Sequence, residues 1–339
     1  MLKRCLLYCL VLLLVAVEAP IVAAATFKIA TLAPDSTIWM KQMRLGAEQV
    51  EQQTEGRVKL KFYPGGVMGN DRAVLRKIRI GQLQGGAVTT GTLSDVFPDA
   101  QIYSMPMEFR SIDEVMYVRK HMDGDIAAGL EKKGLALLGM SNGGFAYVAS
   151  TKPIRTIEDL KARRVWLPQG DLLGEAVFKA AGVSPVPLAL PDVYTALETG
   201  LLDTIIANPS SIIAFQWHTK IKYLTDVPIL FLMGTLVVDQ RAFAKISPAD
   251  QKVMHDVMGG VFSKLDELNH QDNVKAREVL VANGIQFVET TAEERDRWRQ
   301  VALKAIQDMR KEGDYTMAFL EKMRKYIQQY REQNKNNAS

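Results

Sequence analysis

The chain has 339 residues, of which 47% are hydrophobic and 24% are charged, and its formal net charge is +4 at pH 7. So nearly balanced a charge argues against a nucleic-acid-binding protein and against a strongly cationic membrane surface. A chain of this length can bury large hydrophobic cores and usually divides into two domains.

The beginning of the chain has the pattern of an export signal. Two basic residues precede an apolar run at residues 6–17, which is short for a membrane span, and small residues follow at 22–25. We therefore predict a signal peptide at residues 1–25, cleaved near Ala24 or Ala25, and an exported mature protein.

The predicted signal peptide holds both cysteines of the chain, Cys5 and Cys9. The mature protein is therefore expected to have neither a disulfide framework nor a thiol nucleophile. Loss of Lys3, Arg4 and Glu18 with the signal peptide changes the formal charge only from +4 to +3, so the charge stays nearly balanced.

Short strands alternate with helices in the first half of the mature chain. One predicted helix carries Met40, Met43 and Val50 on a single face, and either Asp35 or Ser36 is expected to cap it. The pattern predicts strands at residues 27–32, 57–63 and 85–90, and a second helix at 73–80.

The second half repeats this alternation. Thr156 and Asp159 have the spacing of a capping box at a helix start. The pattern then predicts strands at residues 165–167, 186–190 and 203–207, and helices at 172–181 and 191–199. Two α/β units, each with helices over a mostly parallel sheet, are the simplest fold that fits.

One predicted helix is much longer than the others. It begins at Ser247 and Pro248, keeps one apolar face and ends before Asn283 and Gly284. Such a helix would be roughly 50 Å long at the usual rise per residue, which exceeds one small domain, so it is expected to run along both units. The apolar pattern weakens near Asn269, and two consecutive helices broken there are the alternative.

A possible catalytic motif lies in the middle of the chain. Residues 139–143 match G-x-S-x-G, the serine hydrolase motif, with Ser141 as the nucleophile. That motif needs a helix directly after the serine, whereas residues 142–148 are expected to form a turn that enters a strand. An exported serine hydrolase using Ser141 is therefore the alternative function.

Metal and nucleotide sites have little support in the sequence. The four histidines lack metal-ligand spacing, and residues 65–69 lack the lysine that ends a phosphate-binding loop. The basic residues at 161–164 are few and run into an apolar strand, so they are expected to form a solvated turn. We expect no metal, no cofactor and no nucleic-acid partner.

Several short motifs, in order from about residue 26 to 284, resemble one protein family. The class is that of the solute-binding subunits of tripartite ATP-independent periplasmic (TRAP) transporters, of the DctP type. The motifs are F-K-I-A at 27–30, Y-P-G-G at 63–66 with M-G at 68–69, M-P at 105–106 with F-R at 109–110, K-P-I at 152–154 with E-D-L-K at 158–161, P-L at 187–188 with D-V-Y at 192–194, and N-P at 208–209.

The resemblance implies a periplasmic protein with a two-domain periplasmic-binding-protein-like α/β fold, crossing segments and a long interdomain helix. It implies a monomeric receptor, not an enzyme, which closes around a small organic anion and delivers it to the small and large subunits of a TRAP membrane permease. The implied divisions are domain I at 26–146 with 232–271, domain II at 147–231 with 272–330, and a flexible tail at 331–339.

The residue expected to anchor a carboxylate differs from the family pattern. Members usually place an arginine on the strand after the D-L-K motif, and Trp166 occupies that place here. A second basic position falls on Ala146, whereas Asn208 matches the family's asparagine at the cleft. Without these two basic residues, it is in question whether a solute carboxylate binds here in the way usual for the family. In that mode each charge-assisted hydrogen bond is worth about 1.5–3 kcal/mol.

Three interpretations of Trp166 are open. The ring could form a stacking wall for a flatter or more apolar solute. Alternatively, Arg163, Arg164 or a bound cation takes over an anion, although Arg164 alone shares the strand face of Trp166. In the third interpretation Trp166 packs in the core and the site lies elsewhere.

The remaining candidate ligand-binding residues offer neutral hydrogen bonds or aromatic surface. For Asp35 the alternative is a simple helix cap, and for Trp39 and Trp217 it is core packing. Together with Trp166, the candidates are Asn208, Gln169, Gln216, Asp35, Trp39, Thr89, Thr90 and Trp217.

Overall fold

The computed structural model describes residues 24–313 and 315–337. The predicted signal peptide, with Cys5 and Cys9, lies outside the described residues except at Ala24 and Ala25, and Ala25 is the first residue of strand β1. Within the described part of the chain, we find no helix with the length and apolar character that a membrane crossing requires.

A seven-stranded mixed sheet forms the centre of the molecule, with the order β2-β1-β3-β8-β4-β7 and with β9 paired to β8. The first three strands are parallel, and the pairs β3-β8, β8-β4 and β4-β7 are antiparallel. The bounds are Ala25–Thr31 (β1), Val58–Tyr63 (β2), Gly85–Thr89 (β3), Leu135–Ser150 (β4), Thr204–Ala207 (β7), Tyr223–Asp239 (β8) and Gln286–Val288 (β9).

Two further strands form a small parallel pair, β5 (Trp166–Pro168) and β6 (Val186–Leu188). A single parallel bridge from Val165 to Thr204 joins this pair to β7. The strands predicted at 165–167, 186–190 and 203–207 are therefore confirmed. The expectation of mostly parallel pairing holds for β2-β1-β3, β5-β6 and β8-β9. It fails where the long strands β4 and β8 pair antiparallel with each other, with β3 and with β7.

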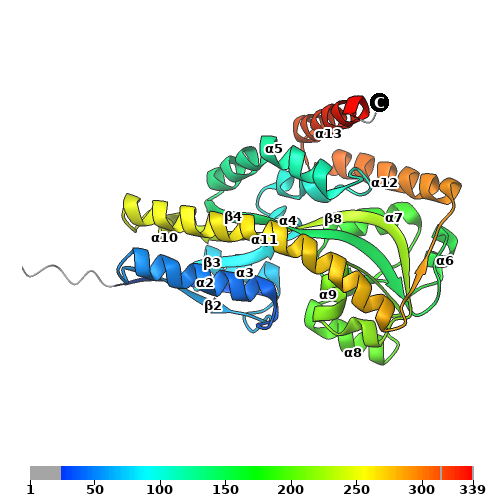
Figure 1. The fold of residues 1–339 in the computed structure, drawn as a ribbon, viewed down its shortest axis with the longest axis horizontal. Coiled ribbons are helices and arrows are strands. Elements are labelled where there is room, and N and C mark those ends of the chain that lie inside the picture. Colours follow the sequence, from blue (N-terminus) through cyan, green and yellow to red (C-terminus); the bar gives the residue numbers. More distant parts are fainter. Residues whose placement is uncertain (1–23, 314, 338–339) are drawn as a thin grey trace, which may run out of the picture.

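The helices cover both faces of the sheet (Figure 1). Their bounds are Ile38–Gln53 (α2), Asp71–Arg79 (α3), Thr90–Leu93 (α4), Ile112–Lys132 (α5), Ile157–Lys161 (α6), Leu172–Ala181 (α7), Val193–Glu198 (α8), Pro209–Ala214 (α9), Gln240–Phe243 (α10), Pro248–Ala282 (α11), Ala292–Glu312 (α12) and Met317–Asn337 (α13). Short 3-10 helices occupy Pro98–Ser104 (η1), Leu190–Asp192 (η2) and Trp217–Thr219 (η3).

These elements form two lobes, shown side by side in Figure 1. The first lobe contains β1, β2 and β3 with α2 and α3, and the second contains β5, β6 and β7 with α6 to α9. The strands β4 and β8 and the helix α11 run through both lobes. Each lobe has its own buried cores: Met40 and Phe62 lie in one core of the first lobe, and Trp166 and Trp217 lie in one core of the second.

The long helix α11 is continuous over 35 residues, with Ser247 as its N-cap and Pro248 in its first turn. The alternative of a break near Asn269 is therefore wrong. Asn269 and Asn273 are buried, and their side-chain amides donate to the backbone oxygens of Asn142 and Gly143 in β4. The apolar pattern weakens at this point because the helix contacts the sheet through polar side chains.

Helix caps agree with the sequence in one case and differ in another. The capping box of Thr156 and Asp159 at the start of α6 is confirmed. The cap of α2 is Thr37, whose hydroxyl accepts from the Met40 N–H, and neither Asp35 nor Ser36 takes that role. The helix begins at Ile38, later than expected, because Pro34 and Thr37 close a turn before it.

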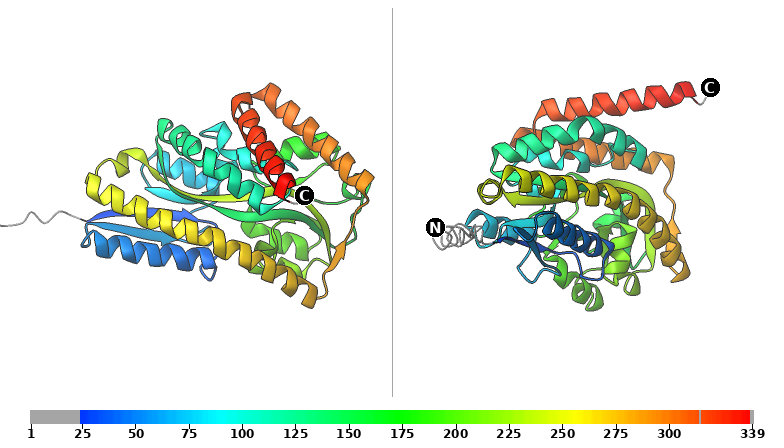
Figure 2. Two further views of the ribbon diagram at one scale, coloured as in Figure 1. Left: turned by 45° about the horizontal axis from the view of Figure 1, so that its top comes forward. Right: turned by 60° about the vertical axis from the view of Figure 1, so that its left-hand side comes forward.

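The C-terminal helix α13 lies along α5, as the two views of Figure 2 show. Residues 331–337, expected to be part of a flexible tail, continue this helix. Arg331 anchors it through an ion pair with the buried Glu114 at 2.7 Å. Its apolar residues Leu320, Met323 and Ile327 are buried against the first-lobe side, although the predicted division places residues up to 330 in domain II.

Candidate functional site

The carboxyl ends of the parallel strands in the two lobes face each other. Thr89, the last residue of β3, pairs with Gly234 of β8, and Gly234 pairs in turn with Ser141 of β4. Ala207, the last residue of β7, pairs with Tyr147, further along β4. The intervening residues 142–146 span roughly 15–20 Å at the usual strand rise. The two sets of strand ends thus point toward each other along β4.

Loops that follow these strands touch across the lobes. The Asn70 side-chain amide donates to the Gln169 side-chain oxygen at 3.4 Å. The Arg72 guanidinium lies so close to Gly170 that a Cβ atom there would be 2.3 Å from its Nη1 atom. Since ligands of α/β proteins bind outside the carboxyl ends of the strands, we take this region, named the lobe junction, as the candidate solute site. The lobe junction comprises residues 63–72 and 89–92 of the first lobe and residues 168–171, 188–191 and 208–210 of the second.

Three buried oxygen atoms in the lobe junction have no hydrogen-bond partner. They are Oδ1 of Asp71, Oγ1 of Thr90 and Oδ1 of Asn208, half of the six such side-chain atoms in the described part of the chain. The three residues are only 6%, 1% and 5% exposed. An unpaired buried polar group costs about 1–3 kcal/mol, and such groups are rare in folded proteins. Their concentration here indicates a place built to receive hydrogen bonds from another molecule.

Asp71 is the most unusual of these residues. Its Oδ2 atom accepts from the Thr89 N–H at 3.1 Å and from the hydroxyls of Thr89 and Thr92 at 3.4 and 3.5 Å. All these partners are neutral. Burial raises the pKa of the Asp71 carboxyl to about 6, and the hydrogen bonds offset only part of that rise. A buried carboxyl group without a cation is therefore a central feature of the lobe junction.

The raised pKa makes the stability contribution of Asp71 depend on pH. Between about pH 4 and pH 6 the native state keeps a proton that the unfolded chain has lost, so the free energy of unfolding falls as pH rises, by an amount on the order of 3 kcal/mol. We expect Asp71→Asn to remove this fall, so that the variant gains stability relative to wild type over this range. Urea denaturation of both proteins at several pH values measures the difference. Asp256→Asn, at an exposed position on α11, is the control, and a difference that does not change with pH would contradict the prediction.

Asn208 begins α9 directly after β7, and both hydrogens of its amide are used. The amide donates to the Gly143 backbone oxygen and, at 3.1 Å, to the Ser210 hydroxyl. Only the Oδ1 atom is left without a partner. Asn208, Thr89, Thr90 and Gln169 are thus the predicted site residues that the structure brings to the lobe junction. Their contact with a solute stays a prediction.

Trp166 is packed within the second lobe. Its side chain is 5% exposed, its indole N–H donates to the Leu188 backbone oxygen at 3.0 Å, and its ring meets Trp217 edge to face at 5.5 Å. Trp217 in turn stacks on Phe215. These contacts support the interpretation of Trp166 and Trp217 as core residues, and the stacking role of Trp166 stays a prediction.

The other predicted residues have different surroundings. Trp39 is partly buried against the core under α11, where it packs on Gly234 and meets Phe262 edge to face at 5.3 Å. Asp35 is exposed and forms an ion pair with Arg44. Gln216 is exposed, with a left-handed backbone at φ 58°. Asp35 and Gln216 therefore have the surroundings of surface residues.

The arginines proposed as substitute anion partners are already paired. Arg164 bonds Asp203 through its Nε atom at 3.4 Å, and Arg163 donates to the Asp159 backbone oxygen at the same distance. At the lobe junction, Arg72 contacts Asp95 through two nitrogen atoms, at 2.8 and 2.9 Å. An anion would have to compete with a carboxylate for each of Arg72 and Arg164.

Sequence analysis missed Asp71, Asn70 and Arg72. They lay between the turn predicted at 64–66 and the helix predicted at 73–80, and in the structure that helix begins earlier, at Asp71, with Asn70 as its cap. A signal was available, because polar residues directly follow the turn after a predicted parallel strand. The neutral surroundings of Asp71 come from Thr89 and Thr92, however, and the sequence does not reveal that contact.

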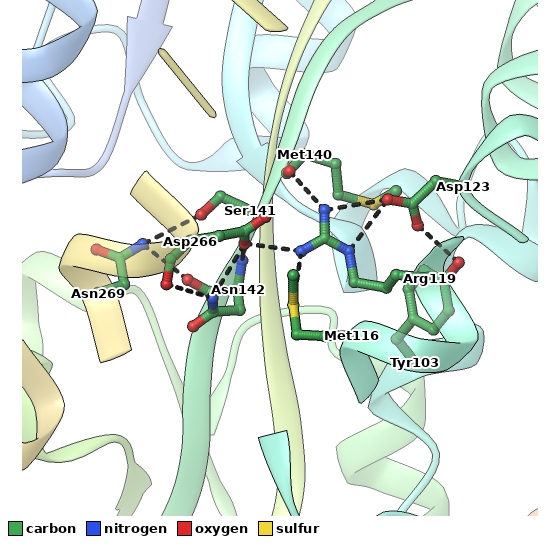
Figure 3. A network of polar contacts seen from close by, with 9 residues as sticks. All are labelled: Tyr103, Met116, Arg119, Asp123, Met140, Ser141, Asn142, Asp266 and Asn269. Carbon is green, nitrogen blue, oxygen red and sulfur yellow. Dashed lines mark hydrogen bonds and ion pairs between the residues drawn. The ribbon is translucent and has the colours of Figure 1, made fainter. Parts of the chain in front are cut away.

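A buried ion-pair network ties the lobes together at the point where β4 passes between them (Figure 3). Arg119 of α5 contacts Asp266 of α11 at 2.7 Å and Asp123 at 3.0 Å, and it donates to the Met140 backbone oxygen at 2.8 Å. Asp266 also accepts from the Asn142 N–H at 2.7 Å. Burial by itself would lower the pKa of Arg119. The neighbouring carboxylates of Asp123 and Asp266 have the larger effect together, and the pKa of Arg119 is raised. One guanidinium thus joins α5, β4 and α11.

Ser141 belongs to the same region and has no catalytic geometry. It lies inside β4 with a fully buried side chain, and its hydroxyl accepts from the Asn269 amide at 3.3 Å (Figure 3). No helix follows it, so the nucleophile elbow of a hydrolase is absent from this position. Among the described residues, no group of three or more His, Cys, Asp or Glu side chains could hold a metal ion.

Two α/β lobes joined by long strands and one long helix, with polar strand ends facing each other, define a two-domain solute-binding protein. Comparison with known proteins agrees. The chain belongs to the DctP family, because the family model described as bacterial extracellular solute-binding protein, family 7, matches residues 29–312. The protein is therefore a solute-binding receptor and not an enzyme, and the hydrolase alternative is wrong.

Relatives of known solute lie at low sequence identity. The sialic acid-binding periplasmic protein SiaP of Vibrio cholerae is 24% identical over 79% of this chain and 82% of its own. The 2,3-diketo-L-gulonate-binding periplasmic protein YiaO of Escherichia coli is 26% identical over 60% of this chain, and the match spans less than two thirds, 63%, of YiaO.

A solved structure shows the same fold. The TRAP periplasmic solute-binding protein from Sulfitobacter sp. NAS-14.1, with bound β-D-galacturonate, has a TM-score of 0.82 at 18% identity, covering 88% of this chain and 99% of that one. At this identity the likeness establishes the fold alone.

Proposed function

We propose that this protein captures a small organic solute at the lobe junction and delivers it to the small and large subunits of a TRAP membrane permease. The observation that carries the proposal is the cluster of unpartnered buried oxygens of Asp71, Thr90 and Asn208 between facing strand ends. The relatives named above bind sialic acid, 2,3-diketo-L-gulonate and galacturonate, which are small organic acids. They support the size and general class of the solute.

Capture by hinge closure fits the connections between the lobes. The chain passes between them through β4, β8 and α11, which are proposed to act as the hinge. The domain ranges stay a prediction, with 26–146 and 232–271 in one domain and 147–231 and 272–330 in the other. Contacts from Asn70 to Gln169 and from Arg72 to Gly170 lie away from the crossings. They are the contacts that opening would break.

The receptor is proposed to act in the periplasm as a monomer. Export follows from a signal peptide at residues 1–25 with cleavage near Ala24 or Ala25. DctP proteins include periplasmic binding proteins, among them SiaP and YiaO. A Tm measured on the mature chain from Thr26 therefore reports the relevant molecule.

Solute binding is expected to stabilise the mature protein. A solute at one hundred times its Kd adds about 2.7 kcal/mol to the free energy of unfolding, which raises Tm by several degrees. Thermal melting in the presence of a library of small metabolites, followed by X-ray scattering on each hit, measures stabilisation and closure together. The expected result is a raised Tm with a smaller radius of gyration, and a library without any stabilising compound would contradict the proposal.

A further inference from the structure

We infer that the solute carries a positively charged nitrogen, such as an ammonium group, which binds the Oδ1 atom of Asp71. This inference rests on the proposed function and names one group of the solute. It assigns the solute to the small organic amines, zwitterions included. The organic acids named for the relatives do not require such a group.

The first argument concerns hydrogen-bond direction. The free atoms of Asp71 and Asn208 are both Oδ1 oxygens, and the amide hydrogens of Asn208 are already donated to Gly143 and Ser210. An ionised carboxylate and an amide oxygen can only accept hydrogen bonds. The solute must therefore present donors to these two positions, and a solute carboxylate offers only acceptors.

The second argument concerns charge. Asp71 is 6% exposed, and the groups bonded to it, from Thr89 and Thr92, are neutral. A buried charge usually has a partner of opposite sign, since leaving it alone in a low-dielectric site costs several kcal/mol. A hydroxyl donor would complete the hydrogen bonds but leave the charge uncompensated. An ammonium group supplies three donors and the missing charge together.

The third argument concerns the nearby cations, which are committed elsewhere. Arg72, the next residue along α3, is bonded to Asp95 and packs on Gly170. Lys77, one helical turn and a half further on, donates to the Met68 backbone oxygen at 2.9 Å. Arg76, between them, is exposed. In the described part of the chain, no hydrogen bond or ion pair joins Asp71 to any of these three cations, so the compensating charge is left to the solute.

The raised pKa of Asp71, about 6, agrees with this arrangement. The carboxyl group is mostly ionised at pH 7 although its surroundings favour the neutral form. A cationic nitrogen at Oδ1 would lower this pKa again, because an opposite charge within hydrogen-bond distance favours the ionised carboxylate.

Affinity selection with mass spectrometry tests the inference. Mature wild type, Asp71→Asn and the distant control Asp256→Asn are each incubated with one mixture of amines, neutral polyols and carboxylic acids at equal concentration. We expect wild type and Asp256→Asn to retain a compound with a cationic nitrogen. Asp71→Asn is expected to bind that compound at least about tenfold more weakly in titration calorimetry, the loss of one charge-assisted hydrogen bond.

A second measurement needs only wild type, so it does not depend on the folding of the variant. N-acetylation of the retained amine removes its charge and is expected to weaken binding by a similar factor. A tightest compound without a cationic nitrogen, or equal binding by Asp71→Asn, would overturn the inference while leaving the receptor function intact. Retention of no compound would overturn the receptor function itself, and the inference with it.

Discussion

Replacing Trp166 with alanine is expected to lower the free energy of unfolding by about 3–5 kcal/mol, the usual cost of removing a large aromatic side chain from a core. The side chain is 5% exposed and packs edge to face on Trp217. Its loss leaves a cavity beside β6 and removes the donor to the Leu188 backbone oxygen. Urea denaturation of the mature protein without solute measures the effect directly.

The variant Trp166→Phe separates packing from hydrogen bonding. It retains an aromatic ring against Trp217 but loses the indole N–H, so we expect a smaller loss from the missing hydrogen bond, about 1 kcal/mol, plus a further cost for the reduced volume. If Trp166→Ala unfolds at the same urea concentration as wild type, Trp166 is not a core residue. A stacking role toward a solute would then regain support.

The contrast between Trp166 and α11 shows how far local sequence determines structure here. The long helix is encoded locally, by its Ser247 cap, its Pro248 start and its periodic apolar face, and it was predicted to within a few residues. The surroundings of Trp166 depend on Trp217 and Leu188, which lie far away in sequence. The family motif therefore indicated correctly that Trp166 lies on a strand, but not which way its side chain packs.

The strand β4 shows a second limit of sequence analysis. Residues 142–148 were interpreted as a turn that enters a strand, yet they belong, with the glycine-rich residues before them, to a single sixteen-residue strand. Register shifts at Gly139 and Gly144 absorb the irregularity as bulges. Gly139 faces the Phe262 ring, where a Cβ atom would lie 2.4 Å away, and Gly144 has φ +89°. These glycines permit close packing against α11, a tertiary requirement that resembles a turn signal in the sequence.

The candidate site was predictable in outline. Thr89 and Thr90 were chosen from their place at a short predicted strand, Asn208 from its match to the family's asparagine, and Gln169 as a neutral hydrogen-bonding partner. All four lie at the lobe junction in the structure. Asp71 was not among the predicted residues, and its place at a helix start has an ordinary explanation in the helix dipole. Its importance comes from burial without a cation, which depends on how β3 and α4 pack against α3.

Replacing Arg119 with methionine is expected to lower the free energy of unfolding by about 3 kcal/mol, since it removes a buried guanidinium and leaves two partly buried carboxylates without their cation. Arg119 is 6% exposed, and its loss removes the cation that Asp266 and Asp123 share. Chemical denaturation of Arg119→Met, Asp266→Asn and the double variant measures the coupling, expected at 0.5–3 kcal/mol for residues in one network.

The matched control is Lys322→Met, which breaks a half-exposed ion pair with Asp125 on the same helix, α5. Such a pair is worth about 0–1 kcal/mol, so the two variants should differ by several kcal/mol. Because the Arg119 network joins α5 and α11 to β4 where that strand passes between the lobes, its loss should also loosen the hinge. Arg119→Met is therefore expected to show a larger radius of gyration than wild type in the absence of solute. Equal stability of Arg119→Met and Lys322→Met would show that the network does not hold the lobes together.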